Sequence, residues 1–125
     1  MSGGAQGIGA AIVRGFAAAG AKVVIGDLDI AGASALAGQV GATAAQLDVG
    51  DAGMVQKIMS QHGPFDIVVN NAGVDQHAFF TDTTPEDWTR LLAVNLVSVL
   101  ACTHAALPAM QAAGYGRIVN IASEA

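Results

Sequence analysis

Short runs of apolar, often β-branched residues alternate along the chain with longer segments whose apolar residues recur at helical spacing. A strand with one face in solvent alternates apolar and polar residues, whereas these runs are continuously apolar. They therefore predict strands that are buried on both faces in a parallel sheet. We expect four strands, at residues 22–27, 42–47, 66–70 and 117–122. The segments with helical spacing predict helices at residues 7–19, 30–39, 51–62 and 84–113.

Start and stop signals flank these predicted helices. The segment Thr84–Asp87 reads TPED, which is an N-cap residue, a proline at the first helical position and two acids facing the helix dipole. Gly20 and Gly114 follow the first and last helices, where glycine commonly ends a helix. The pair Gly63-Pro64 stops the third.

A glycine-rich segment, SGGAQGIG, opens the chain at residues 2–9 and leads directly into the first predicted helix. Gly3, Gly7 and Gly9 stand in a G-x-x-x-G-x-G spacing. Glycines let the backbone approach a pyrophosphate closely, and the following helix points its first N–H groups at the anion. The segment is therefore a candidate phosphate-binding loop, with ordinary turn glycines as the alternative.

The alternation of strands and helices predicts an α/β fold with right-handed crossovers. We expect one partial domain over residues 1–125, a doubly wound parallel sheet of Rossmann-like type with helices on both faces. A glycine loop of this kind normally follows a strand, so the first strand is expected to be missing, as is the C-terminal part of the fold. Either Met1–Gly3 supplies a stub of that strand, or the sheet has a gap beside strand 22–27.

Polar residues follow the predicted strands at the edge where parallel sheets bind ligands. Asp27 ends the first strand, Asp48 follows the second, the sequence NNAG at Asn70–Gly73 follows the third, and Ser123 follows the last. Asp27 lies about 18 residues after Gly9, near the spacing of a ribose-binding acid. Each aspartate could instead cap the next helix, and the two interpretations stay open.

Composition excludes several kinds of partner. The 125 residues are 53% hydrophobic, which allows a buried core, and the net charge of −5 disfavours nucleic acid and anionic membranes. No His, Cys or acid cluster has metal-ligand spacing, and a single cysteine excludes an internal disulfide. We see no uninterrupted apolar run of about 18 residues, so we expect no membrane span and a cytoplasmic location.

Taken together, these segments resemble the classical short-chain dehydrogenases/reductases. The sequences GGAQGIG, VVIGDLD, LDV, NNAGV, VNL and GRIVNIAS occur in the order seen in that family and cover essentially the whole chain. The resemblance implies the N-terminal, cofactor-binding portion of an oxidoreductase. It also implies a small-molecule alcohol or ketone as substrate and a homo-oligomeric parent enzyme.

The resemblance assigns roles to particular residues. It implies that the cofactor is bound by Gly3, Gly7, Ile8, Gly9, Asp27, Asp48, Asn71, Ala72 and Gly73. Asn95 and Ser123 match two members of the catalytic tetrad of the family. Because an acid ends strand 22–27 and no arginine lies near it in sequence, we expect NAD rather than NADP as the cofactor.

The rest of the catalytic group has no match in these residues. The family uses a Tyr followed four residues later by a Lys, whereas here the one tyrosine is Tyr115 and position 119 is Val119. A milder departure is Ser2, where the family usually has Thr. We therefore expect an oxidoreductase truncated before its proton donor and inactive by itself; the alternative is a catalytically inactive nucleotide-binding or fold-only fragment.

Overall fold

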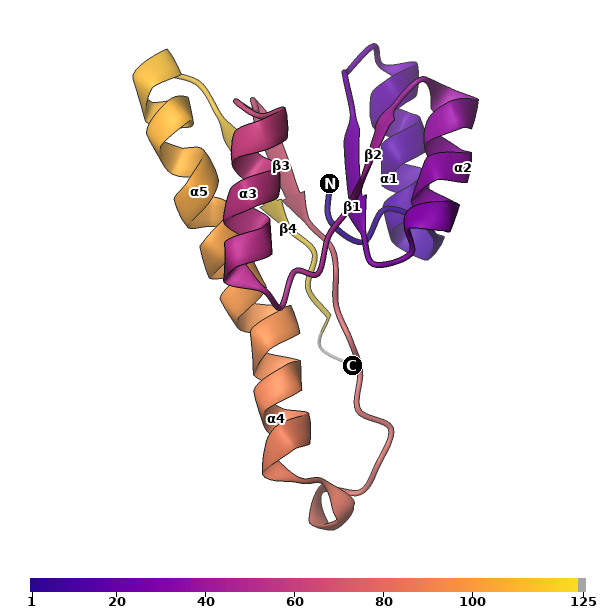
Figure 1. The fold of residues 1–125 in the computed structure, drawn as a ribbon, viewed down its shortest axis with the longest axis vertical. Helices are drawn as coiled ribbons and strands as arrows, with labels where there is room; N and C mark the ends of the chain where they lie inside the picture. Colours follow the sequence, from indigo (N-terminus) through magenta and orange to yellow (C-terminus); the bar gives the residue numbers. More distant parts are fainter. Residues whose placement is uncertain (124–125) are drawn as a thin grey trace.

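The elements of the computed structural model follow the predicted alternation, and the structure describes residues 1–123 (Figure 1). In chain order they are α1 Gly7–Ala18, β1 Val24–Asp27, α2 Ile30–Val40, β2 Thr43–Gln46, α3 Ala52–His62, β3 Ile67–Asn70, a 3₁₀ turn Phe80–Asp82, α4 Pro85–Leu92, a π turn Ala93–Val97, α5 Ser98–Ala113 and β4 Arg117–Asn120.

The four predicted strands form two parallel pairs. In one, β1 lies beside β2 with Val24 opposite Thr43; in the other, β3 lies beside β4 with Ile67 opposite Arg117. The expectation of a parallel α/β fold is thus confirmed. Each strand is shorter than predicted.

The segment Met1–Gly3 joins the two pairs and is the predicted stub of a central strand. On one side, the Gly26 N–H donates to the Met1 carbonyl (2.9 Å) and the Gly3 N–H donates to the Gly26 carbonyl (2.8 Å). On the other side, the Ser2 N–H donates to the Val69 carbonyl (3.1 Å). The stub alternative is therefore correct, although the stub makes only a single ladder bridge, between Ser2 and Gly26.

A groove of about 580 Å³ lies where the stub is too short to offer further hydrogen-bond pairing to β1 and β3. Its walls come from the approach to β1, including Lys22 and Val23, and from the approach to β3, including Phe65 and Ile67. The groove lies at the amino-end side of the strands, away from the edge where the predicted site residues follow them.

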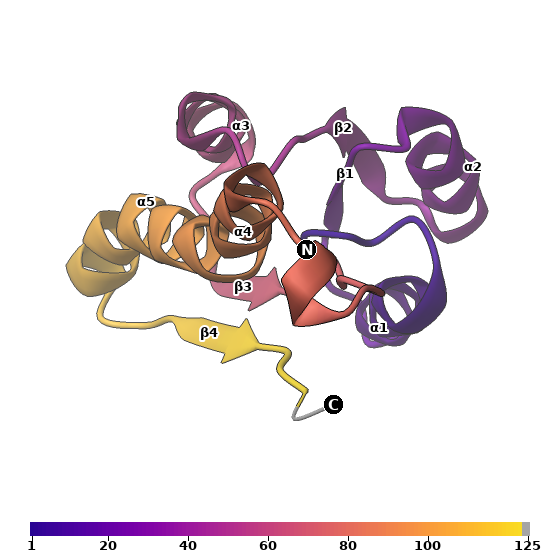
Figure 2. The same ribbon diagram turned by 90° about the horizontal axis from the view of Figure 1, so that it is seen from below.

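Helices cover both faces of the strands, as predicted (Figure 2). Helices α1 and α2 pack against β1 over one core, whose buried residues are Val13, Ile25, Ala33, Leu36 and Ala37. Helices α3 and α5 pack on the other face over a second core, whose buried residues are Leu47, Val49, Val55, Val68, Cys102, Ala106 and Met110. Burial raises the pKa of the Cys102 thiol, which marks it as a packing residue rather than a nucleophile.

The helix predicted over 84–113 begins as expected but is not uniform. Thr84 and Asp87 form a capping box, and the backbone N–H of Thr84 lowers the pKa of the Asp87 carboxyl. Around Asn95 the helix widens into a π turn over Ala93–Val97. Helical periodicity alone does not reveal such a turn, because one wide turn barely shifts the apolar face.

The same helical segment bears on the expectation that the chain has no membrane span. Pro85–Ala113 is a 29-residue helix with a window of mean hydropathy 1.8, long and apolar enough to cross a bilayer by these two criteria alone. Polar residues such as Asn95 and His104 interrupt the apolar run, so a search for uninterrupted apolar residues and a mean hydropathy give different answers for this segment. A single apolar helix is weak evidence, since core helices pass the same test. The absence of a membrane partner stays a prediction.

The stub generates a prediction about stability. The buried Ser2 hydroxyl accepts hydrogen bonds from the N–H groups of Asn71 (3.1 Å) and Ala72 (3.2 Å). Replacing Ser2 with Ala leaves both donors without this acceptor, so we expect a loss of about 1–3 kcal/mol in the free energy of unfolding. Urea denaturation measures it, with Ser34→Ala on the exposed face of α2 as the control. Equal stability of the two variants would contradict the prediction.

Candidate functional site

A cleft of about 320 Å³ lies beyond the carboxyl ends of β1, β2 and β3. All but one of the nine residues expected to bind a cofactor line this cleft; the exception is Gly7, at the start of α1. Sequence reasoning did not name six further lining residues, which are Gln6, Leu28, Leu47, Val49, Val74 and Val94. Most of these are apolar residues next to the polar positions, so only the strand-end rule could have pointed to them.

The glycine loop is built around one close backbone approach. Gly3 has a φ of +62°, a conformation that favours glycine. A Cβ added to Gly9 would collide with the carbonyl oxygen of Gly3. The first turn of α1 therefore lies directly against the loop, which brings its N–H groups to the cleft.

Asn71 fixes this loop to the segment that follows β3. Its side-chain amide donates to the Gly3 carbonyl (2.8 Å) and, more weakly, to the Ser2 carbonyl (3.3 Å). The glycine loop and the NNAG segment, about 70 residues apart in sequence, are therefore a single hydrogen-bonded unit. Asn71 shapes the cleft through the backbone, and the neighbouring Ala72 and Gly73 line it.

Asp27 holds the glycine loop from the side of β1. One carboxylate oxygen accepts from the Ala5 N–H (2.9 Å) and the other from the Asp29 N–H (3.0 Å). The interpretation of Asp27 as a helix cap was wrong, because Asp29 is the N-cap of α2 and accepts from Gly32. Asp27 ends its strand two residues too early to cap that helix, and its carboxylate faces the cleft region instead.

Asp48 is likewise not a helix cap. Its carboxylate accepts from the Gly50 N–H (2.8 Å), while Asp51 is the N-cap of α3 and accepts from the Met54 N–H (3.0 Å). The backbone N–H of Asp48 donates to the sulfur of Met54 (3.1 Å). Asp48 is thus held at the cleft wall by a tight turn and by the first turn of α3.

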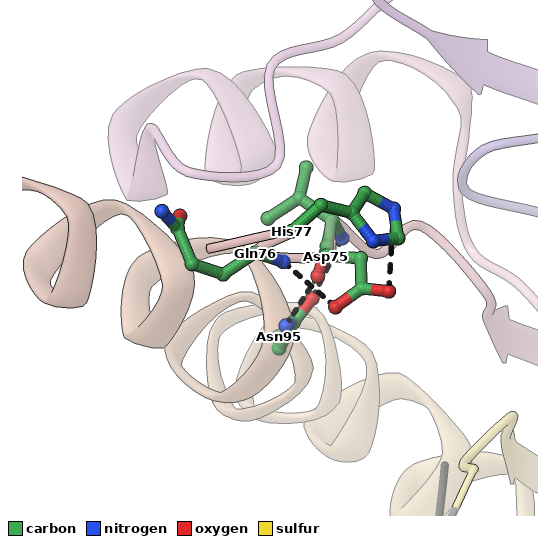
Figure 3. Close-up of polar contacts among 5 residues, drawn as sticks. Asp75, Gln76, His77 and Asn95 are labelled. Atoms are coloured by element: carbon green, nitrogen blue, oxygen red, sulfur yellow. Dashed lines mark hydrogen bonds and ion pairs between the residues drawn. The ribbon is translucent and has the colours of Figure 1, made fainter. Parts of the chain in front are cut away.

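Asn95 pairs with the backbone of Val74 through both ends of its amide (Figure 3). Its carbonyl oxygen accepts from the Val74 N–H (2.9 Å) and its NH₂ donates to the Val74 carbonyl (2.8 Å). The side chain has both of these partners although the residue is exposed. The π turn places Asn95 beside the loop, a geometry often found at functional sites. Its partner is backbone, which no side-chain pattern reveals.

Ser123 follows β4 at the same edge of the sheet but does not line the cleft. Between β3 and β4, the buried Asn70 donates to the side chain of Asn120 (2.9 Å), which ties the two strand ends together. Asn120 was not among the predicted site residues, although its place at a strand end is the same signal. The structure thus brings together eight of the nine residues expected to bind a cofactor, and Asn95 is bonded to Val74 in the same cleft wall.

Comparison with known proteins identifies the family. A family model described as short chain dehydrogenase matches residues 1–125, the entire chain. The chain belongs to the short-chain dehydrogenase/reductase family. Solved structures agree: a metagenomic short-chain oxidoreductase in complex with NADP superposes with a TM-score of 0.91 at 32% identity, over 98% of this chain and 60% of that one.

Two curated relatives show the same similarity in sequence. The chain is 40% identical to a D-beta-hydroxybutyrate dehydrogenase of Cupriavidus necator, over 98% of this chain and 51% of that protein. It is 39% identical to a D-threitol dehydrogenase of Mycolicibacterium smegmatis, over 100% of this chain and 52% of that protein. The chain spans about half the length of the curated relatives it matches.

The residues present fit the nicotinamide dinucleotides that this family binds. The N-cap Gln6 makes no side-chain capping bond within the described residues, so the first N–H groups of α1 stand open to an anion. The absent Cβ of Gly9 lets the loop pass close to that helix. The carboxylate of Asp27 offers hydrogen-bond acceptors where a ribose would lie in a doubly wound fold.

The close approach at Gly9 gives a test with a matched control on the same helix. In Gly9→Ala the new Cβ must displace the Gly3 carbonyl, so we expect lower stability and at least about a tenfold loss of NADH affinity. In Gly15→Ala the new Cβ meets nothing within 4 Å. That control should be as stable or gain about 0.4–1 kcal/mol. Fluorescence titration and urea unfolding measure both, and unimpaired NADH binding by Gly9→Ala would contradict the prediction.

Proposed function

We propose that this chain supplies the cofactor-binding part of an NAD(H)-dependent oxidoreductase that acts on a carbonyl or secondary alcohol. The observation that carries the proposal is the convergence of the glycine loop, Asp27 and the NNAG segment on one cleft. The two curated relatives are named for hydroxyl-bearing small molecules, which supports an alcohol or ketone substrate. When bound, the nicotinamide would supply the hydride donor or acceptor.

The preference for NAD(H) rests on the charge at the end of β1. The Asp27 carboxylate keeps acceptor capacity beyond its bonds to Ala5 and Asp29, so it can accept from a ribose hydroxyl. A 2′-phosphate would instead face a like charge, and no Lys or Arg of residues 1–123 lines the cleft to offset it. One structural relative is in complex with NADP, so membership of the family does not decide between NAD(H) and NADP(H). The preference proposed here therefore depends on residues of this chain.

Ser123 and Asn95 are proposed as the chain's share of the catalytic machinery. Ser123 would donate a hydrogen bond to the substrate oxygen, and Asn95 would hold the backbone at Val74 that borders the site. Neither is a proton donor suited to neutral pH, and these 125 residues contain no Tyr-x-x-x-Lys.

The homo-oligomeric state implied by the family is proposed to use the α4–α5 face. Leu92, Leu96, Leu100 and Leu107 are exposed along these helices, and no charged residue lies between Arg90 and Arg117. Monomeric proteins rarely leave a large contiguous apolar patch uncovered. The cytoplasmic location and the absence of nucleic-acid partners stay predictions.

The cofactor preference can be tested by neutralising one carboxylate. We expect the chain to bind NADH at least about tenfold more tightly than NADPH, because Asp27 repels the 2′-phosphate. Asp27→Asn should narrow this ratio, whereas Asp66→Asn, which makes the same charge change at the opposite groove, should not. Fluorescence titration with both nucleotides measures the ratios. Equal or better NADPH binding by the unmodified chain would reject the assignment.

The proposed activity is tested by completing the catalytic group. We expect little or no turnover from the 125-residue chain, because general acid–base help is worth about 10² to 10⁴ in rate. Turnover should appear when a segment carrying Tyr-x-x-x-Lys is appended after residue 125. An NADH-linked assay over alcohols and ketones measures both proteins. If purified 125-residue chain turns over and Ser123→Ala abolishes this, an unrecognised proton donor is present and the prediction fails.

A further inference from the structure

The sulfur of Met54 accepts a hydrogen bond from a residue of the cleft wall. The backbone N–H of Asp48 donates to this sulfur over 3.1 Å, and Asp48 lines the cleft just after β2. Methionine side chains mostly fill apolar space, and their sulfur is only a weak acceptor. Met54 also packs against the core under α3 and α5, so its side chain joins an apolar contact to a polar one.

Met54 and Asp48 are also tied together through Asp51. The N–H of Met54, in the first turn of α3, donates to the carboxylate of Asp51, the N-cap residue (3.0 Å). The N–H of Asp51 in turn donates to the carbonyl of Asp48 (3.2 Å). The backbone of Asp48 is therefore held to α3 on both sides, at its carbonyl through Asp51 and at its N–H through Met54.

These contacts leave the carboxylate of Asp48 with room for a ligand. One of its oxygens accepts from the Gly50 N–H (2.8 Å), whereas an ionised carboxylate offers about four lone-pair sites. The remaining sites can only accept, so they suit an N–H or O–H group of a ligand. Leu28 and Val49, which follow β1 and β2, line the same cleft and offer apolar surface to a flat ring.

The place of Asp48 in the sheet decides which half of a dinucleotide it meets. The strand β1 has β2 on one side and the stub on the other. Asp27, at the end of β1, is the proposed ribose-binding acid, and the glycine loop after the stub is the proposed pyrophosphate site. The end of β2 is one strand further from the pyrophosphate, so it lies nearest to the base of the adenosine half.

We propose that Met54 is a positioning residue whose sulfur holds the Asp48 backbone so that the Asp48 carboxylate meets the amino group of adenine. The inference rests on the proposed function, because it needs the dinucleotide in the cleft. Without the sulfur, the part-buried N–H of Asp48 has no acceptor among the described residues, and the turn must move to bring that N–H to water. The carboxylate of Asp48 would move with it.

The experiment compares two dinucleotides that differ only in the base. NADH carries the amino group of adenine, whereas reduced nicotinamide hypoxanthine dinucleotide has a carbonyl oxygen in its place, which cannot donate to a carboxylate. Fluorescence titration of the 125-residue chain with each gives the ratio of the two affinities. We expect NADH to bind at least about tenfold more tightly. Met54→Leu nearly keeps the side-chain volume but removes the acceptor, and should lower this ratio at least about fivefold.

Two further variants separate the hydrogen bond from packing. Met59 lies on the same helix and packs against the same core, but its sulfur makes no hydrogen bond within residues 1–123. Met59→Leu should therefore leave the ratio unchanged. Met54→Gln supplies a side-chain carbonyl that can accept from Asp48 and should retain most of the ratio. Met54→Ile provides a second variant without an acceptor should Met54→Leu fold poorly.

The outcomes separate the two proposals. The role of Met54 is overturned, while the proposed function stands, if NADH binds the unmodified chain no better than the hypoxanthine dinucleotide or if Met54→Leu keeps the ratio. It is also overturned if Met59→Leu lowers the ratio equally, or if Met54→Gln loses it as fully as Met54→Leu. If NADH does not bind in the cleft, the proposed function fails and this inference fails with it.

Discussion

The whole structure depends on three residues between two strand pairs. Met1–Gly3 is hydrogen-bonded to β1 on one side and to β3 on the other, and elsewhere the two pairs share no ladder. The core under α3 and α5 also packs Leu47 and Val49, which follow β2, with Val68 of β3, so apolar contacts supplement these hydrogen bonds. A full central strand normally forms many hydrogen bonds with the strands on either side of it. Here single hydrogen bonds, such as that from the Ser2 N–H to the Val69 carbonyl, join the two strand pairs.

The same contacts that join the halves also shape the site. The Asn71 side chain donates to the Gly3 carbonyl, and Asp27 accepts from Ala5, so both hold the glycine loop rather than standing free for a ligand. Residues that the family resemblance assigns to cofactor binding are therefore structural as well. A substitution at either position changes the loop and the ligand contact together, and only a pairing of stability and binding measurements separates the two effects.

Periodicity and the strand-end rule were enough to predict the parallel strands and the polar residues Asp27, Asp48 and Asn71 at the cleft. They work because buried parallel strands are continuously apolar and because their carboxyl ends meet at one edge. They could not decide whether Asp27 and Asp48 cap helices, since the cap depends on where the turn ends, and Asp29 and Asp51 proved to be the caps. The pairing of Asn95 with Val74 was also out of reach, because a backbone partner leaves no trace in the sequence.

The position of the cleft couples binding to the weak connection. Its walls come from both halves, with Asp27 and Leu28 on one side of the stub and Gly73 and Val94 on the other. A dinucleotide bound there would contact both strand pairs, so it would add contacts across a junction where the stub makes few backbone hydrogen bonds. A ligand that binds only the folded state stabilises it by about 2.7 kcal/mol at one hundred times its dissociation constant. That is comparable to what a few buried hydrogen bonds contribute, so the cofactor would take over part of the role of a central strand.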